Sequence, residues 1–83
     1  KKNIIGNRAS TIFDREMLMT VKVLFEHNLN ISSAARALYV HRNSLIYRID
    51  KLLNQTGLDI RNFEDAVMLR ILLSDELANK YLT

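Results

Sequence analysis

Apolar residues along the chain recur at intervals of three and four, which is the spacing of helices that bury one face. The first clear stripe consists of Leu18, Val21, Leu24 and Phe25. Asp14 precedes this stripe and is a residue type that caps helix starts. The chain has no proline and only two glycines, so few positions interrupt a helix. The pattern predicts an all-α fold, a small helical bundle of four main helices, whose first helix covers about residues 15–27.

The next two predicted helices are short and long, with a tight turn between them. Asn30 is placed to cap the first through the amide of Ser32 or Ser33, and its body at residues 33–38 is rich in alanine. Small side chains let such a helix lie close to a neighbour. Tyr39 and Val40 form the turn. A short helix, a turn and a longer amphipathic helix together are typical of a helix-turn-helix.

The longer helix of this pair is predicted over residues 42–55, with His41 as its N-cap. Its inward face is formed by Leu45, Ile49, Leu52 and Leu53. Gly57 stands where a helix end favours a left-handed residue, and Leu58 can make the accompanying apolar contact. In a helix-turn-helix this second helix is the one that enters the major groove of DNA.

A fourth helix is predicted from Asn62 to about Tyr81, opened by a shortened capping box with Asp65. One broad apolar face is expected to contain Phe63, Ala66, Val67, Ile71, Leu73, Leu77, Ala78 and Tyr81. A second is expected to contain Met68, Leu69 and Leu72. Because residues 1–12 lack clear periodicity, we expect residues 1–13 to be a linker or lead-in and residues 14–83 to be the domain.

A chain of 83 residues is long enough for one domain and leaves little core for a large enclosed pocket. It has no cysteine, which excludes a thiol nucleophile and cysteine-bound zinc and is compatible with the cytoplasm. The longest apolar runs, of three or four residues, are much shorter than the roughly 20 of a membrane span. Since the sequence begins at Lys1, we expect an excised fragment of a longer protein.

The net charge of +3 is concentrated in one segment. Residues 36–51 contain four Lys or Arg residues and one acid, whereas the rest of the chain has eight of each sign. This distribution points towards a phosphate-bearing partner, although a solvated helix face has the same appearance.

The polar side of residues 42–55 carries the residue types that read base edges. Arg42, Asn43 and Ser44 occupy its first turn, where a recognition helix penetrates deepest, and Arg and Asn make bidentate contacts to guanine and adenine. Tyr47, one turn later, is expected to contact thymine methyl, sugar or phosphate, or else to be a half-buried packing residue. The expected phosphate contacts are Arg48, Lys51 and Arg36.

Three further residues have two interpretations each. His41 is a helix cap, or a phosphate contact that strengthens on protonation. Ser32 and Ser33 are first-turn residues, or groups that meet phosphate beside the groove.

The sequence itself resembles the C-terminal helix-turn-helix domain of PucR/CdaR bacterial transcriptional regulators, within the wider Fis-like group. The similarity covers about residues 16–82, and its most specific parts are residues 41–45 (HRNSL), 47–48 (YR) and 56–59 (TGLD). It implies a DNA-binding output module whose upstream domains sense a metabolite such as a purine catabolite or a sugar diacid. It also supports Arg42, Asn43, Ser44, Tyr47 and Arg48 as the residues that read DNA. Two departures are Ile46, where the family often has Arg, and Phe63, where it often has Pro.

Other classes of function are weighed against DNA binding. His27 and His41 are fourteen residues apart with no nucleophile or carboxylate set at triad or ligand spacing, so we expect no enzyme, no metal and no cofactor. The alternative is a helical protein-interaction module, because the last helix has more apolar surface than one side of a bundle requires. That surface is covered within the monomer, or it forms a homodimer or meets the absent upstream domains, where any small-molecule effector would bind. The expected location is the bacterial cytoplasm, associated with the nucleoid.

Overall fold

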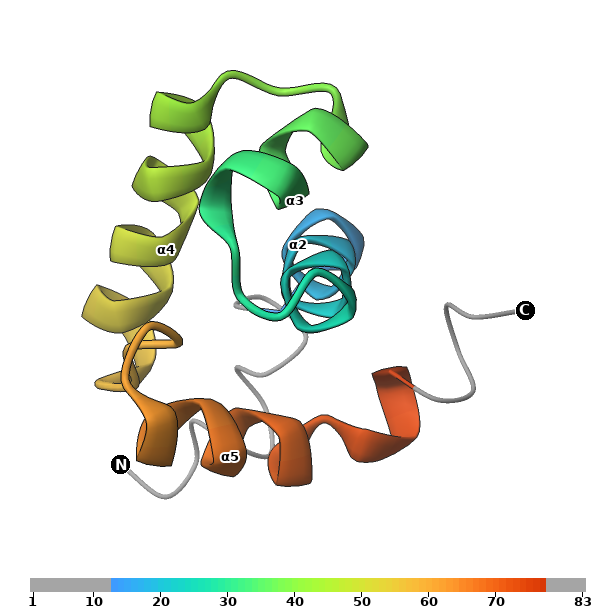
Figure 1. The fold of residues 1–83 in the computed structure, drawn as a ribbon. Helices are drawn as coiled ribbons and strands as arrows, with labels where there is room; N and C mark the ends of the chain where they lie inside the picture. The colour runs from blue at the N-terminus through green and yellow to red at the C-terminus, as the bar shows by residue number, and fades with distance from the viewer. Residues whose placement is uncertain (1–12, 78–83) are drawn as a thin grey trace.

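The computed structural model describes residues 13–77, and within this range the chain forms helices joined by turns and short irregular segments, with no strand. Its helices are α2 (Arg15–Glu26), α3 (Ile31–Leu38), α4 (Arg42–Thr56) and α5 (Phe63–Leu72). Figure 1 shows α2 nearly end-on in the middle, with α3 and α4 packed around it and α5 crossing beneath. The predicted all-α fold with four main helices is therefore confirmed.

Each helix begins at a side chain that accepts a hydrogen bond from a backbone amide of the first turn. Asp14, Asn30, His41 and Asn62 bond the amides of Met17, Ser33, Asn43 and Asp65. Three of these bonds measure 2.8 to 3.0 Å, and the bond to His41 Nδ1 is longer, at 3.4 Å. Because the first amides of a helix have no partner within it, these caps determine where each helix begins. The four predicted N-caps are thus confirmed.

The turns that follow α3 and α4 both use the left-handed backbone region. Gly57 ends α4 with φ of 80°, and its amide donates to the Leu53 carbonyl at 2.7 Å, as expected for glycine at a helix end. Tyr39 ends α3 with φ of 59°, a conformation that costs a residue with a Cβ about 1 to 2 kcal/mol. The turn between α3 and α4 is therefore tight, as predicted.

The core lies where α2, α3 and α4 meet. It contains the stripe of α2, the alanines of α3 and the inward face of α4, with Val21, Ala34 and Leu45 completely inaccessible. Alanine at the α3 contact allows the helices to approach closely. Phe25 and Leu53, which were expected to point inward, are only half-buried at the edge of this core.

The last helix differs from its prediction in length and in orientation. Regular helix ends at Leu72, and residues 74–77 form one further helical turn of different geometry. The predicted end at Tyr81 and the contribution of Ala78 lie outside the described residues. The buried positions are Ala66, Leu69, Leu73 and Leu77. The predicted division into two faces is wrong, because this stripe at i, i+3, i+7 and i+11 takes members from both.

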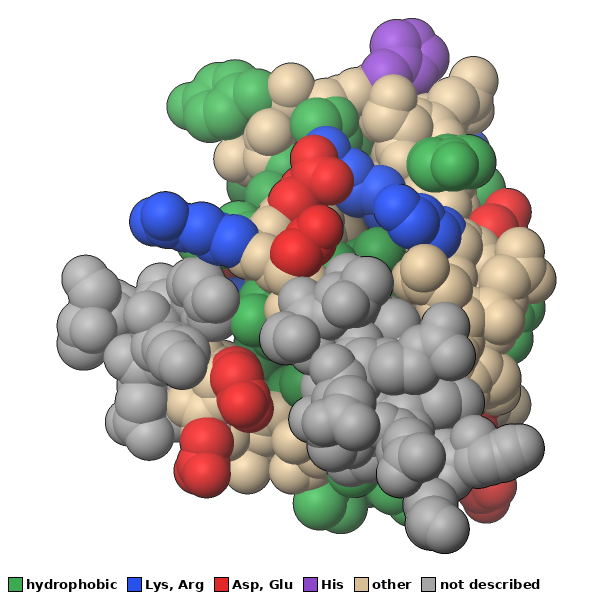
Figure 2. Space-filling model, turned by 180° about the vertical axis from the view of Figure 1, so that it is seen from behind, with side chains coloured by type: hydrophobic (Ala, Val, Ile, Leu, Met, Phe, Trp, Pro, Cys, Tyr) green, Lys and Arg blue, Asp and Glu red, His purple; other side chains and the backbone are tan. Residues whose placement is uncertain are grey.

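The exposed side of α5 is strongly apolar. Its accessible residues are Phe63, Val67, Met68, Ile71 and Leu72, with Phe63 77% and Ile71 64% exposed. Hydrophobic side chains come to the surface at the lower edge of Figure 2, which is the end of the molecule where α5 runs in Figure 1. Leu69, which was expected to share a face with Met68 and Leu72, points into the core instead.

The start of α5 is held by a different set of contacts from the predicted capping box. Asn62 accepts from the Asp65 amide as expected, but the Asp65 carboxylate accepts from the Asp59 amide at 3.0 Å and not from Asn62. The Asn62 amide donates instead to the Asp59 carbonyl at 2.8 Å. The reciprocal half of the box is therefore wrong, because the loop from Gly57 brings Asp59 closer to the carboxylate.

Arg61 connects this loop to α4. It bonds Asp59 at 2.8 Å and Asp50 at 3.0 Å. The hydrogen bonds from the Arg61 side chain and backbone hold the pKa of the Asp59 carboxyl below its ordinary value, and the same pairing raises the pKa of Arg61. The contacts orient the α4–α5 connection at the surface.

Candidate nucleic-acid interface

The outer side of α4 is polar and open to solvent. Asn43, Ser44, Tyr47 and Lys51 are all exposed, and the opposite side of the helix buries Leu45, Ile49 and Leu52. Tyr47 is 68% exposed, so its interpretation as a half-buried packing residue is wrong. The helix therefore presents a free polar face, as a recognition helix requires for contact with base edges.

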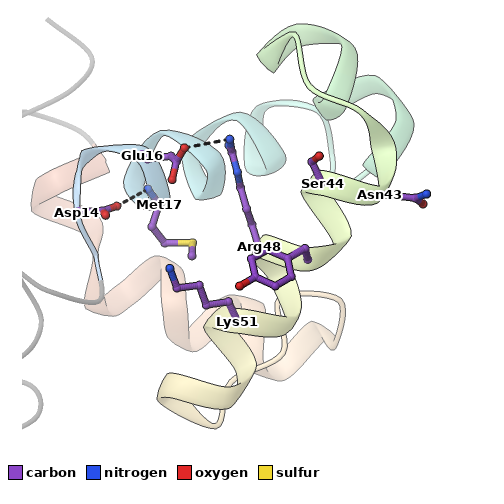
Figure 3. A pocket seen from close by; sticks show the side chains of 8 residues that line it. Asp14, Glu16, Met17, Asn43, Ser44, Arg48 and Lys51 are labelled. Atoms are coloured by element: carbon purple, nitrogen blue, oxygen red, sulfur yellow. Dashed lines mark hydrogen bonds and ion pairs between the residues drawn. The ribbon is translucent and has the colours of Figure 1, made fainter.

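The first turn of α4 projects from the tight turn after α3. Arg42 and Asn43 are exposed, and Arg42 has no ion pair with any residue between 13 and 77. His41 uses Nδ1 to accept from the Asn43 amide, which confirms its capping role. The other ring nitrogen, Nε2, takes no part in this hydrogen bond. Figure 3 shows the Asn43 side chain directed away from the body of the protein.

A groove of about 440 Å³ separates this face of α4 from the start of α2. Its lining residues are Asp14, Glu16, Met17, Asn43, Ser44, Tyr47, Arg48 and Lys51. Figure 3 shows Arg48 reaching from α4 to the Glu16 carboxylate of α2, and Lys51 directed towards the start of α2. The groove unites four of the predicted recognition residues with Lys51. It adds Glu16 and Met17 of α2 and the N-cap Asp14, which sequence reasoning had not assigned to this surface.

Arg48 is the one residue of the predicted set that is fixed across this groove. Its guanidinium donates to Thr20 Oγ1 at 3.0 Å and to Glu16 Oε2 at 3.1 Å, and its side chain is 21% exposed. Thr20 is buried, and its hydroxyl donates in turn to the Glu16 carbonyl at 2.8 Å. No local signal could have revealed these partners, because they lie 28 and 32 positions away in sequence.

The predicted residues of α3 lie apart from the groove. Ser32 and Arg36 are exposed and Ser33 is half-buried. The Ser33 amide is already bonded by Asn30, and its hydroxyl accepts weakly from Arg36 at 3.4 Å. These contacts are those of an ordinary first helical turn, and none of the three residues lines the groove.

The charges around the groove nearly cancel. Two acids, Glu16 of α2 and its N-cap Asp14, line the groove together with two cations of α4, Arg48 and Lys51. Acidic and basic side chains also lie beside one another across the face drawn in Figure 2. Asp14 is committed to the cap of α2, and Lys51 has no ion pair with a described residue. The basic character predicted for residues 36–51 is thus partly compensated by acids from α2.

The described part of the chain has neither a metal-binding cluster nor a membrane-spanning helix. Residues 13–77 contain no group of three or more His, Cys, Asp or Glu side chains that could hold a metal ion. None of their helices is long and apolar enough to cross a membrane.

A short alanine-rich helix, a tight turn and a longer helix with an exposed polar face define a helix-turn-helix domain. The profile of the PucR C-terminal helix-turn-helix domain matches residues 17–74. The chain belongs to this family of transcriptional-regulator domains, which is not a family of enzymes.

Several bacterial proteins contain a similar segment. The uncharacterized protein YxkF of Bacillus subtilis is 35% identical over 81% of the chain, the carbohydrate diacid regulator of Escherichia coli 39% over 65%, and the purine catabolism regulatory protein of B. subtilis 38% over 72%. The matched segments are 23%, 14% and 11% of those proteins, so the chain spans less than a quarter of each relative's length. No solved structure matches the chain significantly.

Proposed function

We propose that this domain binds double-stranded DNA in a sequence-specific manner, with α4 in the major groove. The observation that carries the proposal is the exposed polar face of α4, set beyond a tight turn and opposite a fully buried apolar face. Family membership supports a role in transcription regulation. The names of two relatives refer to regulation by a carbohydrate diacid and of purine catabolism. We extend this to a metabolite-responsive bacterial regulator in the cytoplasm, with its effector bound outside this chain.

We assign base reading to the first turn of α4. Arg42 and Asn43 are exposed and free to make bidentate contacts to guanine and adenine, and Ser44 can donate to a base or a phosphate. Tyr47 lies one turn further along the same face, and we assign it a contact to sugar, phosphate or a thymine methyl group.

We assign phosphate contacts to the residues around this turn. Lys51 is exposed on α4, and His41 retains Nε2 as a donor. From α3 we include Ser32, Ser33 and Arg36. Arg48 belongs to this group through its position, but it reaches phosphate only by exchanging its present partner Glu16. The domain proposed to carry these contacts is residues 14–83, with residues 1–13 as a linker.

Titration of the chain with a random duplex at several salt concentrations tests DNA binding. Each phosphate contact releases counterions, so log affinity should fall linearly with log salt at about −0.9 per contact. With several contacts we expect a slope of about −3 to −5. No detectable binding to any duplex at low salt contradicts the proposal and favours the protein-interaction alternative.

Arg42→Ala and Lys51→Ala separate base reading from phosphate contact. The preferred sequence is first selected from a random duplex pool. Arg42→Ala should then weaken binding to that sequence by about 1 to 3 kcal/mol and relax its base preference, whereas Lys51→Ala should weaken binding to all sequences alike. Equal losses of both variants on selected and random DNA contradict the assignment of Arg42.

The exposed apolar side of α5 favours a second role alongside DNA binding. Five large apolar side chains are more than 40% accessible there. Such a patch on a small domain is typical of a protein-interaction surface. We propose that it pairs with a second copy of the chain, with the absent upstream part of the regulator as the other possible occupant.

A further inference from the structure

Arg48 lies at the edge of the proposed DNA-binding face, yet its charge is already paired. Its guanidinium spans the groove from α4 to α2, where Glu16 Oε2 is 3.1 Å away and Thr20 Oγ1 is 3.0 Å away (Figure 3). The Thr20 contact is on the buried side of the guanidinium and the Glu16 contact is on the solvent side, since Thr20 is 1% exposed and the Glu16 side chain 68%.

The exposed half of this contact is chemically exchangeable. A carboxylate and a phosphate are both anionic acceptors for the same guanidinium fork, and both make short charge-assisted bonds with it. An ion pair open to water is weak, so an incoming phosphate can replace it. The contact to buried Thr20 meanwhile holds the guanidinium in the groove that Tyr47 and Lys51 also line.

The Glu16 carboxylate also lies in the groove beside the proposed DNA-binding face. Glu16 lines the same groove as Asn43, Ser44 and Lys51, and its side chain is 68% exposed, so its carboxylate lies beside the face proposed for DNA and is open to solvent. Asp14 lies in the groove as well, but its carboxylate is occupied by the Met17 amide. Glu16 is therefore the acid of the groove that is both exposed and paired with a recognition-face cation.

We propose that Glu16 competes with DNA phosphate for Arg48 and so lowers the affinity of the domain for duplex DNA. The inference rests on the proposed DNA-binding function and deepens it. Arg48 then supplies no phosphate contact while Glu16 holds it, and it becomes available when that carboxylate is neutral or displaced. Glu16 is a determinant of affinity that acts through Arg48 and makes no contact with DNA itself.

Glu16→Gln tests the competition, because glutamine keeps the shape of the side chain and removes its charge. We expect the 83-residue variant to bind a random duplex about two- to fivefold more tightly than wild type at 0.1 M salt. The slope of log affinity against log salt should become more negative by about 0.9, which is the signature of one added phosphate contact. Glu16→Ala should change affinity and slope in the same direction, and circular dichroism verifies that both variants are folded.

Glu26→Gln is the matched control on the same helix. Glu26 pairs with Lys22 at 2.8 Å, so this variant also removes one acid and frees one cation. It lies ten residues along α2, about 15 Å from Glu16, which exceeds the screening length of about 10 Å at 0.1 M salt. Its slope should equal that of wild type. If Glu16→Gln and Glu26→Gln change binding equally, the effect is one of net charge and the competition is disproved.

A double-mutant cycle identifies Arg48 as the intermediary. In an Arg48→Gln background, Glu16→Gln should no longer steepen the slope, because the cation that it liberates is absent. A steeper slope in both backgrounds, or weaker binding by Glu16→Gln alone, overturns the inference; weaker binding would mean that Glu16 orients Arg48 towards DNA. Failure of wild type to bind any duplex contradicts the proposed function itself and is thus distinguished from failure of this inference.

Discussion

Charged residues of this domain acquire specific partners that neighbouring sequence positions do not indicate. Arg48 is held by Glu16 from another helix, and the guanidinium of Arg70 lies 5.3 Å from the ring centre of Phe25. Arg61 bonds Asp59, two positions before it, and also Asp50 from the preceding helix. At the scale of single residues, the fold thus pairs Arg48 and Arg61 with carboxylates and Arg70 with an aromatic ring, so these three cations have partners within the domain.

The Arg61 contacts predict how stability changes with pH. Because the folded-state pKa of Asp59 is below its ordinary value of 3.8, the ionised carboxylate stabilises the fold above that pH. This contribution is lost as the pH falls from 3.8 through the lower folded-state pKa. Urea unfolding should therefore show that Asp59→Asn is less stable than wild type at pH 7 by less than about 1 kcal/mol, as for other surface pairs.

The difference between the two proteins should disappear in acid. Asparagine retains an oxygen acceptor for Arg61 and removes only the charge, so the two proteins converge as acid protonates Asp59 and both side chains become neutral. A stability difference that stays the same from pH 7 down through this protonation would show that the charge of Asp59 makes no contribution.

At the scale of the helices, local rules determined the helix starts well and one helix face poorly. The four N-caps are polar side chains one position before each helix, short ones at Asp14, Asn30 and Asn62 and an imidazole at His41, and each bonds an amide within four residues of the chain. In α5 nearly every position is apolar, so periodicity cannot indicate which side is inward. The orientation depends on which side meets the core, and the structure turns Leu69 inward and Met68 outward.

Two adjacent substitutions in α5 test this orientation. Leu69→Ala removes a fully buried side chain and should lower the free energy of unfolding by about 2 to 5 kcal/mol. Met68→Ala removes a side chain that is 47% exposed and should change it by less than about 1 kcal/mol. Urea unfolding of the three proteins measures both values, and similar losses for the two variants would place both residues in the core.

At the scale of the whole molecule, the two exposed surfaces have different chemistry. The polar face of α4 and its groove lie on one part of the surface, and the apolar side of α5 lies at the end of the molecule beneath α2 (Figures 1 and 2). A domain with separate polar and apolar surfaces can bind DNA and a protein partner together. Two paired copies that read one side of DNA would use half-sites about 34 Å apart.

Sedimentation equilibrium tests the pairing of two copies. We expect the chain to form dimers at high micromolar concentration, and Ile71→Glu to shift it to monomer because a charge then enters the apolar contact. Ile71 is 64% exposed, so this substitution should leave the fold intact. Glu64→Gln, at an exposed polar position of the same helix, serves as the control. A wild-type chain that remains monomeric throughout disproves self-association through this surface.

The sequence by itself determined the helices, their starts, the glycine stop of α4 and the polar face of α4. These features arise from hydrogen bonds and periodicities within about four residues, so neighbouring positions contain the information. Only the tertiary structure decided that Leu69 points inward and that Arg48 is paired with Glu16 across a groove. These facts depend on packing α2 against α4 and α5 against the core, which joins residues that are distant along the chain.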